Sequence, residues 1–271
     1  MSITSVKAVY FSATGTTEKV VREITSQLAE TLRCAAHYHD FTLPQNRETT
    51  LAFGADDLVV FGVPVYAGRV PNVLVKYLNT LQGEGAQAIA VVVYGNRDYD
   101  DALMEACDIL EHDNMRVIAG AAFVGEHAFS YTLSAQRPDA DDLQKAATFA
   151  QRVAEKIECH DFTRPVVKGT PFPYRAHYQP KDASQNNFDI RKVKPKTADT
   201  CLRCGQCASL CPMGSINPDN VAEITGICIK CGACVKRCPA QAKHFDDPNY
   251  LYHKTNLEEN YQRRAEVEWF V

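Results

Sequence analysis

The sequence predicts an α/β protein with a doubly wound sheet, followed by a smaller cysteine-rich domain. Its 271 residues exceed the roughly 100 to 200 residues that are usual for one domain. The first part alternates short apolar runs with amphipathic stretches, which is the pattern of a parallel sheet covered by helices. Eight of the 11 cysteines fall within 38 residues near the C-terminus, a spacing typical of metal sites rather than disulfides.

Eight segments alternate along residues 1–159, which we interpret as the larger domain. Runs such as residues 58–61 are apolar throughout, as expected of parallel strands that are buried on both faces. The segments between them carry apolar residues four positions apart, for example Val20, Ile24 and Leu28, so we expect helices with one face in the core. The predicted strands are 6–11, 57–63, 88–94 and 116–124, and the predicted helices are 16–32, 70–81, 99–111 and 139–158.

The rest of the chain divides into three parts. Residues 160–198 contain five prolines and little apolar periodicity, which predicts an extended linker, and its aromatic residues indicate packing against a neighbour. Residues 199–246 contain the eight clustered cysteines. Residues 247–271 form a tail whose last three residues, Trp269, Phe270 and Val271, are apolar, so we expect the terminus to dock.

Charge is unevenly distributed along the chain, whose net charge is -4. Residues 1–159 hold 13 basic and 21 acidic side chains, whereas residues 160–198 hold 8 basic and 3 acidic ones. We expect the basic linker to lie on the acidic body. Nucleic-acid binding, which needs clustered cations, is not expected. Because no signal sequence and no run near the roughly 20 apolar residues of a spanning helix is visible, we expect a cytoplasmic protein without membrane insertion.

The cysteine-rich segment is an internal duplication with an offset of 27 residues, and a proline follows the last cysteine of each repeat. The first repeat contains Cys201, Cys204, Cys207 and Cys211, and the second contains Cys228, Cys231, Cys234 and Cys238. Three thiolates three residues apart can bind three corners of a 4Fe-4S cubane, while the cysteine before proline points to the other cluster. We therefore predict crossed sets, with Cys238 completing the first site and Cys211 the second.

Two alternatives to redox-active clusters stay open. Zinc is one, although zinc ribbons use pairs of Cys-x-x-Cys and have no use for a third thiolate at that spacing. Clusters with a purely structural role are the other. Residues 199–246 resemble the bacterial two-cluster ferredoxin module, which implies a small α+β domain with two 4Fe-4S clusters. Cys34, Cys107 and Cys159 lie outside the repeats and are expected to be small buried apolar residues.

The loop after the first predicted strand is a predicted anion site, because it joins the carboxyl end of a strand to a helix N-terminus. It has one glycine and no lysine, unlike the motifs for dinucleotides and nucleoside triphosphates. Its hydroxyl groups and free N–H groups suit a phosphate monoester, although helix capping would explain one or two of the hydroxyls. The loop residues are Ser12, Ala13, Thr14, Gly15, Thr16 and Thr17.

With Tyr10, this loop resembles the phosphate loop of flavodoxins, and residues 1–159 resemble the whole flavodoxin domain. The resemblance implies a five-stranded parallel sheet of order 2-1-3-4-5 and bound FMN, with its ring held between two further loops. Those loops correspond to Pro64, Val65, Tyr66, Ala67, Gly68 and Arg69, and to Tyr94, Gly95, Asn96, Arg97, Asp98 and Tyr99. Tyr66 and Tyr99 are candidates for stacking on the ring, with surface packing as the alternative.

The order of the parts, together with residues 93–103 and Gly125-Glu126-His127, resembles the EFR-type flavodoxin-ferredoxin fusion family. We therefore expect an electron-transfer protein that relays single electrons between two 4Fe-4S clusters and FMN and on to a redox protein partner. One alternative is an FMN-dependent reductase of a small substrate, fed by its own clusters. Another is a redox-sensing or docking module that uses the acidic stretch 98–113. No catalytic residue is identified.

Overall fold

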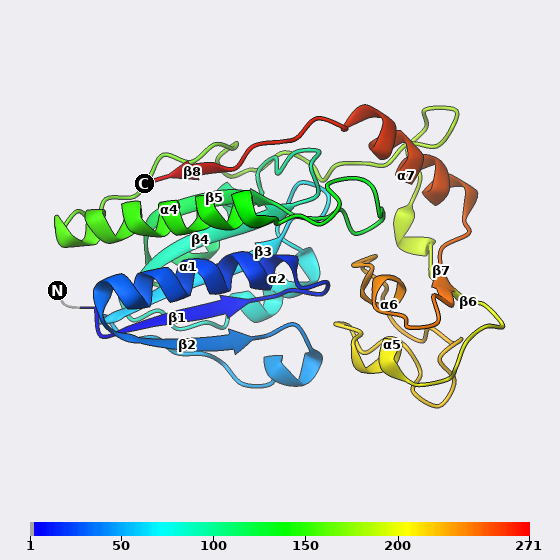
Figure 1. The fold of residues 1–271 in the computed structure, drawn as a ribbon, viewed down its shortest axis with the longest axis horizontal. Helices are drawn as coiled ribbons and strands as arrows, with labels where there is room; N and C mark the ends of the chain where they lie inside the picture. Colours follow the sequence, from blue (N-terminus) through cyan, green and yellow to red (C-terminus); the bar gives the residue numbers. More distant parts are fainter. Residues whose placement is uncertain (1–2) are drawn as a thin grey trace.

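The computed structural model describes residues 3–271, so the first two residues of the predicted domain 1–159 lie outside it. A six-stranded sheet of order β2-β1-β3-β4-β5-β8 forms the larger half (Figure 1). Its first five strands in the chain are parallel and β8 is antiparallel to β5. The strands are β1 (Ser5–Tyr10), β2 (Ala35–Asp40), β3 (Asp57–Pro64), β4 (Gln87–Tyr94), β5 (Arg116–Val124) and β8 (Glu268–Phe270).

Helices cover both faces of this sheet. On one face α1 (Thr16–Leu32) and α4 (Ala140–Glu158) pack with Leu58 and Val60, and on the other α2 (Asn72–Leu78) and α3 (Ala102–His112) pack with Val59 and Phe61. Neighbouring residues of one strand therefore enter different cores, which is why the strand runs are apolar throughout. The doubly wound α/β fold is confirmed.

The sheet has six strands rather than the five that we expected, because the tail returns along the edge of β5. Phe270 pairs with Gly120 in the antiparallel ladder, and the ring of Trp269 stacks on Phe149 with 6.2 Å between centroids. No apolar run marks β2, since it is a largely exposed edge strand of sequence AAHYHD. The pattern of apolar residues therefore predicted neither of the two edge strands, β2 and β8.

The smaller half lies beyond the carboxyl ends of the parallel strands (Figure 1). It contains the antiparallel pair β6 (Lys196–Thr197) and β7 (Lys243–His244), two short helices, α5 (Gln206–Ser209) and α6 (Ala233–Lys236), and the longer α7 (Pro248–Asn260). Two 3-10 turns, η1 (Pro44–Arg47) and η2 (Ile190–Lys192), complete the elements. None of the helices within residues 3–271 is both long and apolar enough to cross a bilayer.

The basic linker lies on the acidic body, as its charge predicts. Arg175 contacts the fully buried carboxylate of Asp101 at 2.6 Å, and Arg164 contacts Asp108 at 2.7 Å and Glu111 at 3.0 Å. These carboxylates belong to the acidic stretch 98–113. The linker therefore occupies part of the surface that the docking alternative assigned to a partner.

We predict that Arg137→Ala strongly destabilises the fold. Arg137 and Asp142 expose 4% and 0% of their side chains, and Arg137 also donates to the carbonyl oxygen of Ala265 in the tail at 2.7 Å. Removing the arginine takes the bidentate partner from a buried carboxylate, which keeps only Arg264 at 3.6 Å and the N–H of Asp139. Breaking a buried pair in this way costs about 3 to 5 kcal/mol of unfolding free energy. Urea denaturation measures this loss. In the control Arg152→Ala, which breaks an exposed pair with Glu155, we expect less than about 1 kcal/mol, and equal losses would contradict the prediction.

Candidate functional site

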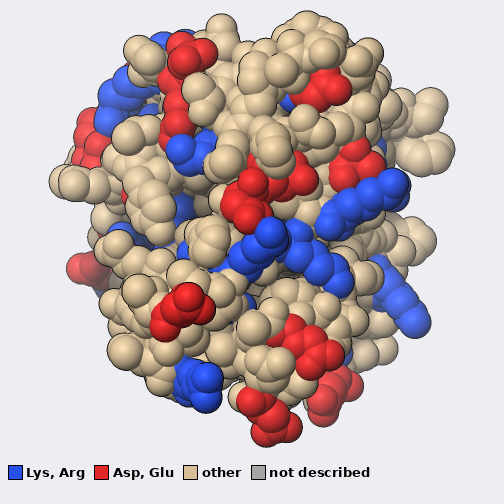
Figure 2. Space-filling model, turned by 90° about the vertical axis from the view of Figure 1, so that its right-hand side faces the viewer, with Lys and Arg blue, Asp and Glu red and all other residues tan. Residues whose placement is uncertain are grey.

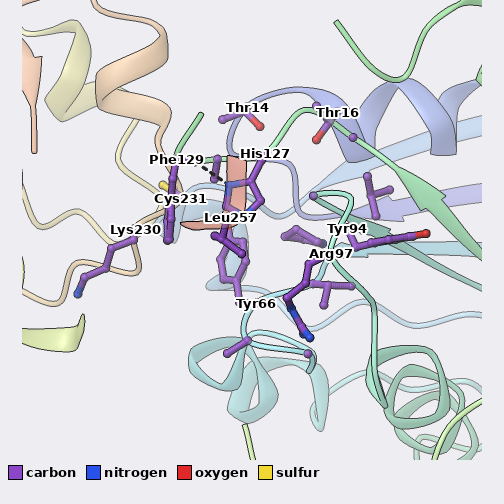
Figure 3. A pocket seen from close by; sticks show the side chains of 18 of the residues that line it. Thr14, Thr16, Tyr66, Tyr94, Arg97, His127, Phe129, Lys230, Cys231 and Leu257 are labelled. Atoms are coloured by element: carbon purple, nitrogen blue, oxygen red, sulfur yellow. Dashed lines mark hydrogen bonds between the residues drawn. The ribbon is translucent and has the colours of Figure 1, made fainter. Parts of the chain in front are cut away.

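A cavity of ≈ 210 Å³ lies between the carboxyl edge of the sheet and the cysteine-rich half (Figure 3). All three predicted loops contribute to its wall, with Ala13, Thr14, Thr16, Thr17, Pro64, Val65, Tyr66, Ala67, Gly68, Tyr94, Gly95, Arg97 and Asp98. The opposite wall comes from the loop after β5, the second cysteine repeat, the linker and α7, including His127, Phe129, Tyr178, Cys231, His253 and Leu257. Segments from the whole length of the chain thus enclose one space.

The first loop forms one end of this cavity, where Figure 3 shows Thr14 and Thr16. Gly15 is the N-cap of α1 and has a φ of 90°, a left-handed conformation that favours glycine. The N–H groups of Thr16 and Thr17 have no acceptor within the helix because they belong to its first turn. This end of the cavity therefore offers hydroxyl and N–H donors, which fit the phosphate group of FMN.

The hydroxyl of Ser12 is used within the loop and the helix that follows it. Its Oγ accepts a hydrogen bond from the N–H of Glu18 at 3.0 Å, and its own N–H donates to Thr42 Oγ1 at 2.7 Å. The residues that line the cavity do not include Ser12 or Gly15 in the described part of the chain. Ser12 therefore holds the loop in place and does not face the cavity.

The second loop brings Tyr66 into the cavity, as predicted for a residue that would contact a flavin ring (Figure 3). Burial, and next the neighbouring Cys231 and Cys228, raise the pKa of Tyr66 well above its ordinary value. Gly68 has a φ of 79°, and a Cβ there would lie 2.2 Å from Asp100 Oδ2. Only glycine fits at this position, so the close approach of the two loops depends on it.

Tyr99, Arg69 and Asn96 do not line the cavity within residues 3–271. Tyr99 is 1% exposed and its hydroxyl donates to Glu268 at 2.9 Å, so it is not placed to stack on a ring there. Arg69 pairs with Glu105 at 2.6 Å. The side-chain amide of Asn96 donates to the carbonyl oxygens of Tyr261 and Arg263, each at 2.6 Å. Arg69 braces α3, whereas Asn96 and Tyr99 anchor the tail.

Two histidines line the cavity on the side of the cysteine-rich half. His127 belongs to the Gly125-Glu126-His127 segment of the family resemblance, whereas nothing in the sequence singled out His253. The Nδ1 of His127 accepts from the N–H of Phe129 at 3.1 Å (Figure 3), which leaves Nε2 as the protonated nitrogen. Burial, and then Lys236, lower the pKa of His127 to about 3, while burial and then Arg97 lower that of His253 to about 4. Both side chains are therefore neutral at pH 7.

Two further cavities are each lined by four cysteines. One contains Cys201, Cys204, Cys207 and Cys238, and the other contains Cys211, Cys228, Cys231 and Cys234. These are the two crossed sets that the duplicated spacing predicts, and iron binding by them stays a prediction. Backbone N–H groups lie 3.4 Å from Cys201 Sγ, 3.4 Å from Cys211 Sγ and 3.2 Å from Cys238 Sγ. Such donors suit thiolates that bind an iron-sulfur cluster.

The two cysteine sets differ in their position relative to the large cavity. Among the described residues, Cys231 is the one cysteine that lines it, and Cys231 also lines the cavity of its own set. We call Cys211, Cys228, Cys231 and Cys234 the proximal set, and Cys201, Cys204, Cys207 and Cys238 the distal set. Of the remaining cysteines, Cys107 is buried as expected, but Cys34 is part-exposed and Cys159 is exposed, the latter because it caps the C-terminus of α4.

Comparisons with known proteins identify both halves. The family model of the flavodoxin domain matches residues 8–107, and that of the 4Fe-4S dicluster domain matches residues 200–243. No curated protein matches the chain.

Solved structures that resemble the chain include three flavodoxins. One from the domain Archaea is 16% identical, with a TM-score of 0.42, and the match covers 57% of this chain and 99% of that one. A flavodoxin of Streptococcus pneumonia TIGR4 is 19% identical, with a TM-score of 0.39 and coverage of 56% and 99%. Oxidised Flavodoxin 2 from Bacillus cereus is 16% identical, with a TM-score of 0.40 and coverage of 56% and 99%. From the two family models, the chain joins a flavodoxin domain to a 4Fe-4S dicluster domain, the architecture of a flavodoxin-ferredoxin fusion with an electron-transfer role.

Proposed function

We propose that the chain relays single electrons between two 4Fe-4S clusters and FMN, and on to a redox protein partner. The observation that carries this proposal is Cys231, which lines both the cavity of the proximal set and the large cavity at the sheet edge. When bound, each cluster would supply a one-electron centre and FMN a centre for one or two electrons. One cysteine side chain would then separate two redox sites, which favours transfer within the chain.

The wall of the large cavity supports this relay over a reductase of a small substrate. Tyr178 of the linker and His253 and Leu257 of α7 cover the side that faces the cysteine-rich half. Tyr178 is fixed in place, since its N–H donates to the carbonyl oxygen of Ala67 at 2.9 Å. These side chains would exclude water from a ring held beside Tyr66.

The distal set supports electron exchange with an outside partner. Cys204 is exposed, whereas the four cysteines of the proximal set are only part-exposed, and the neighbouring Leu202 is 70% exposed. Figure 2 shows this end of the molecule with Lys, Arg, Asp and Glu interspersed. A partner would therefore be selected by shape and apolar contact at Leu202 more than by net charge.

We predict that electrons pass between the cysteine-rich half and the flavin site within one molecule. After rapid reduction of the clusters, flavin reduction should proceed at a rate that does not change with protein concentration, because the two sites share Cys231. Anaerobic stopped-flow absorbance at several protein concentrations measures this rate. A rate proportional to concentration would show transfer between molecules.

We predict that Cys211→Ser damages the proximal site and spares the distal one, because Cys211 is grouped with Cys228, Cys231 and Cys234. Iron and sulfide should fall from about eight to about four or five of each per chain. Electron paramagnetic resonance of the reduced protein would show which site remains. Cys159→Ser, at an exposed cysteine outside both sets, serves as the control and should leave iron unchanged. Stoichiometric zinc in protein purified without oxygen would disprove the clusters themselves.

We predict that Thr14→Val combined with Thr16→Val weakens FMN but not riboflavin, because the two hydroxyls lie at the predicted phosphate end of the cavity. The FMN dissociation constant should rise about tenfold or more, as expected for lost hydrogen bonds to a charged group. Quenching of flavin fluorescence measures both constants. Thr148→Val, whose hydroxyl donates to Gln144 within α4, is the matched control. Equal weakening of both flavins would show that the loop does not bind phosphate.

A further inference from the structure

The two cysteine repeats have the same spacing but contact the flavodoxin half differently. The first repeat meets it where it ends, since Arg47 donates to the carbonyl oxygen of Pro212 at 2.6 Å. Gly232, the N-cap of α6, lies so close to the loop after β5 that a Cβ would be 2.5 Å from the carbonyl oxygen of Ala128. Gly205 stands at the same position of the first repeat, and a Cβ there would meet nothing within 4 Å. The short helix of the second repeat, α6, is therefore docked on the flavodoxin half, whereas α5 of the first repeat begins in open space.

Two consecutive cations at the end of α6 extend from this contact toward the flavodoxin half. Lys236 donates to the carbonyl oxygen of Ser130 at 2.7 Å and forms an ion pair with Glu126. Arg237 reaches the phosphate loop, since its Nη2 lies 3.2 Å from the position of a Cβ built on Gly15. The first repeat has Ser209 and Leu210 at the equivalent positions, so the cation pair is not part of the cysteine motif itself.

No carboxylate in the described part of the chain pairs with the guanidinium of Arg237. Its side chain is exposed and forms no ion pair or hydrogen bond with residues 3–271, whereas the part-buried Lys236 is paired with Glu126 and Ser130. It lies beside Gly15, at the N-terminus of α1 and just outside the cavity lining. The chain neighbours of Gly15, Thr14 and Thr16, line the cavity with donor groups. Donors that converge in this way fit an anion with several oxygens, and a guanidinium binds phosphate oxygens in pairs.

We propose that Arg237 completes the phosphate site from the other half of the molecule, so that the phosphate of FMN is held by both halves at once. This inference rests on the proposed FMN site. The phosphate loop alone lacks a cation, and Arg237 would supply it. Binding and docking must then be linked, because a ligand that contacts both halves binds the docked form better and stabilises it. Arg237 also follows Cys234 and precedes Cys238, so the same contact would keep the proximal set at the cavity.

The test compares FMN with riboflavin, which lacks the phosphate, in the full chain with its iron in place. Arg237→Gln should raise the FMN dissociation constant about tenfold or more, the size of a lost charged hydrogen bond. The riboflavin dissociation constant should change by less than about twofold, because a side chain that does not contact the ligand has little effect on its binding. Arg237→Lys should be intermediate, since lysine retains the charge but not the paired donors. The control is Arg203→Gln, an exposed arginine of the first repeat beside the distal set.

Limited proteolysis in linker residues 160–198 gives a readout that does not depend on electron transfer. FMN should slow cleavage of the wild-type chain more than riboflavin does, and Arg237→Gln should abolish that difference. Equal FMN affinity in the wild type and in Arg237→Gln would overturn the role of Arg237 and leave the FMN site standing. A wild-type chain that does not bind FMN would instead overturn the proposed function. If Arg237→Gln loses iron, the FMN and riboflavin dissociation constants are compared in Arg237→Lys instead. Unchanged FMN affinity in Arg237→Lys would then overturn the proposal.

Discussion

The parallel direction of five neighbouring strands is the constraint on which the arrangement of this molecule depends. Because β1 to β5 all end at the same edge of the sheet, the loops that follow β1, β3, β4 and β5 meet there and share one cavity. A second domain can reach all four loops only from beyond this edge. Gly232 allows that approach, since any side chain at its position would collide with Ala128.

The features that could be predicted from the sequence are those that depend on residues close together in the chain. The predicted strands 57–63 and 88–94 differ by one residue from β3 and β4, because a strand buried on both faces has a continuous apolar run with clear limits. The crossed cysteine sets were likewise predictable, since a repeat with fixed spacing constrains its own geometry. The exposed strand β2 and the ends of α2, Asn72–Leu78 against the predicted 70–81, lack such a signal.

The roles of single loop residues were harder to predict because their partners are distant in the chain. Asn96 and Tyr99 lie in the right loop, but Asn96 bonds to the backbone near Tyr261 and Tyr99 to Glu268. Arg69 likewise pairs with a residue that is distant in the chain, Glu105 of α3. A loop motif indicates which segment faces a ligand. Which side chains of that segment turn inward depends on the tail and the linker, and their course cannot be read from periodicity.

Docking makes the two cysteine repeats different although their motifs are the same. The first repeat keeps Cys204 exposed, and Gly205 faces open space. The second repeat places Cys231 between two cavities and turns Lys236 and Arg237 toward the flavodoxin half. Because solvent exposure and hydrogen bonds to sulfur set the potential of a cluster, equal ligands in these two environments would not give equal centres. A duplicated motif by itself gives two equal sites and no preferred direction of electron flow. Any such direction would thus originate from the contact of α6 with the sheet edge.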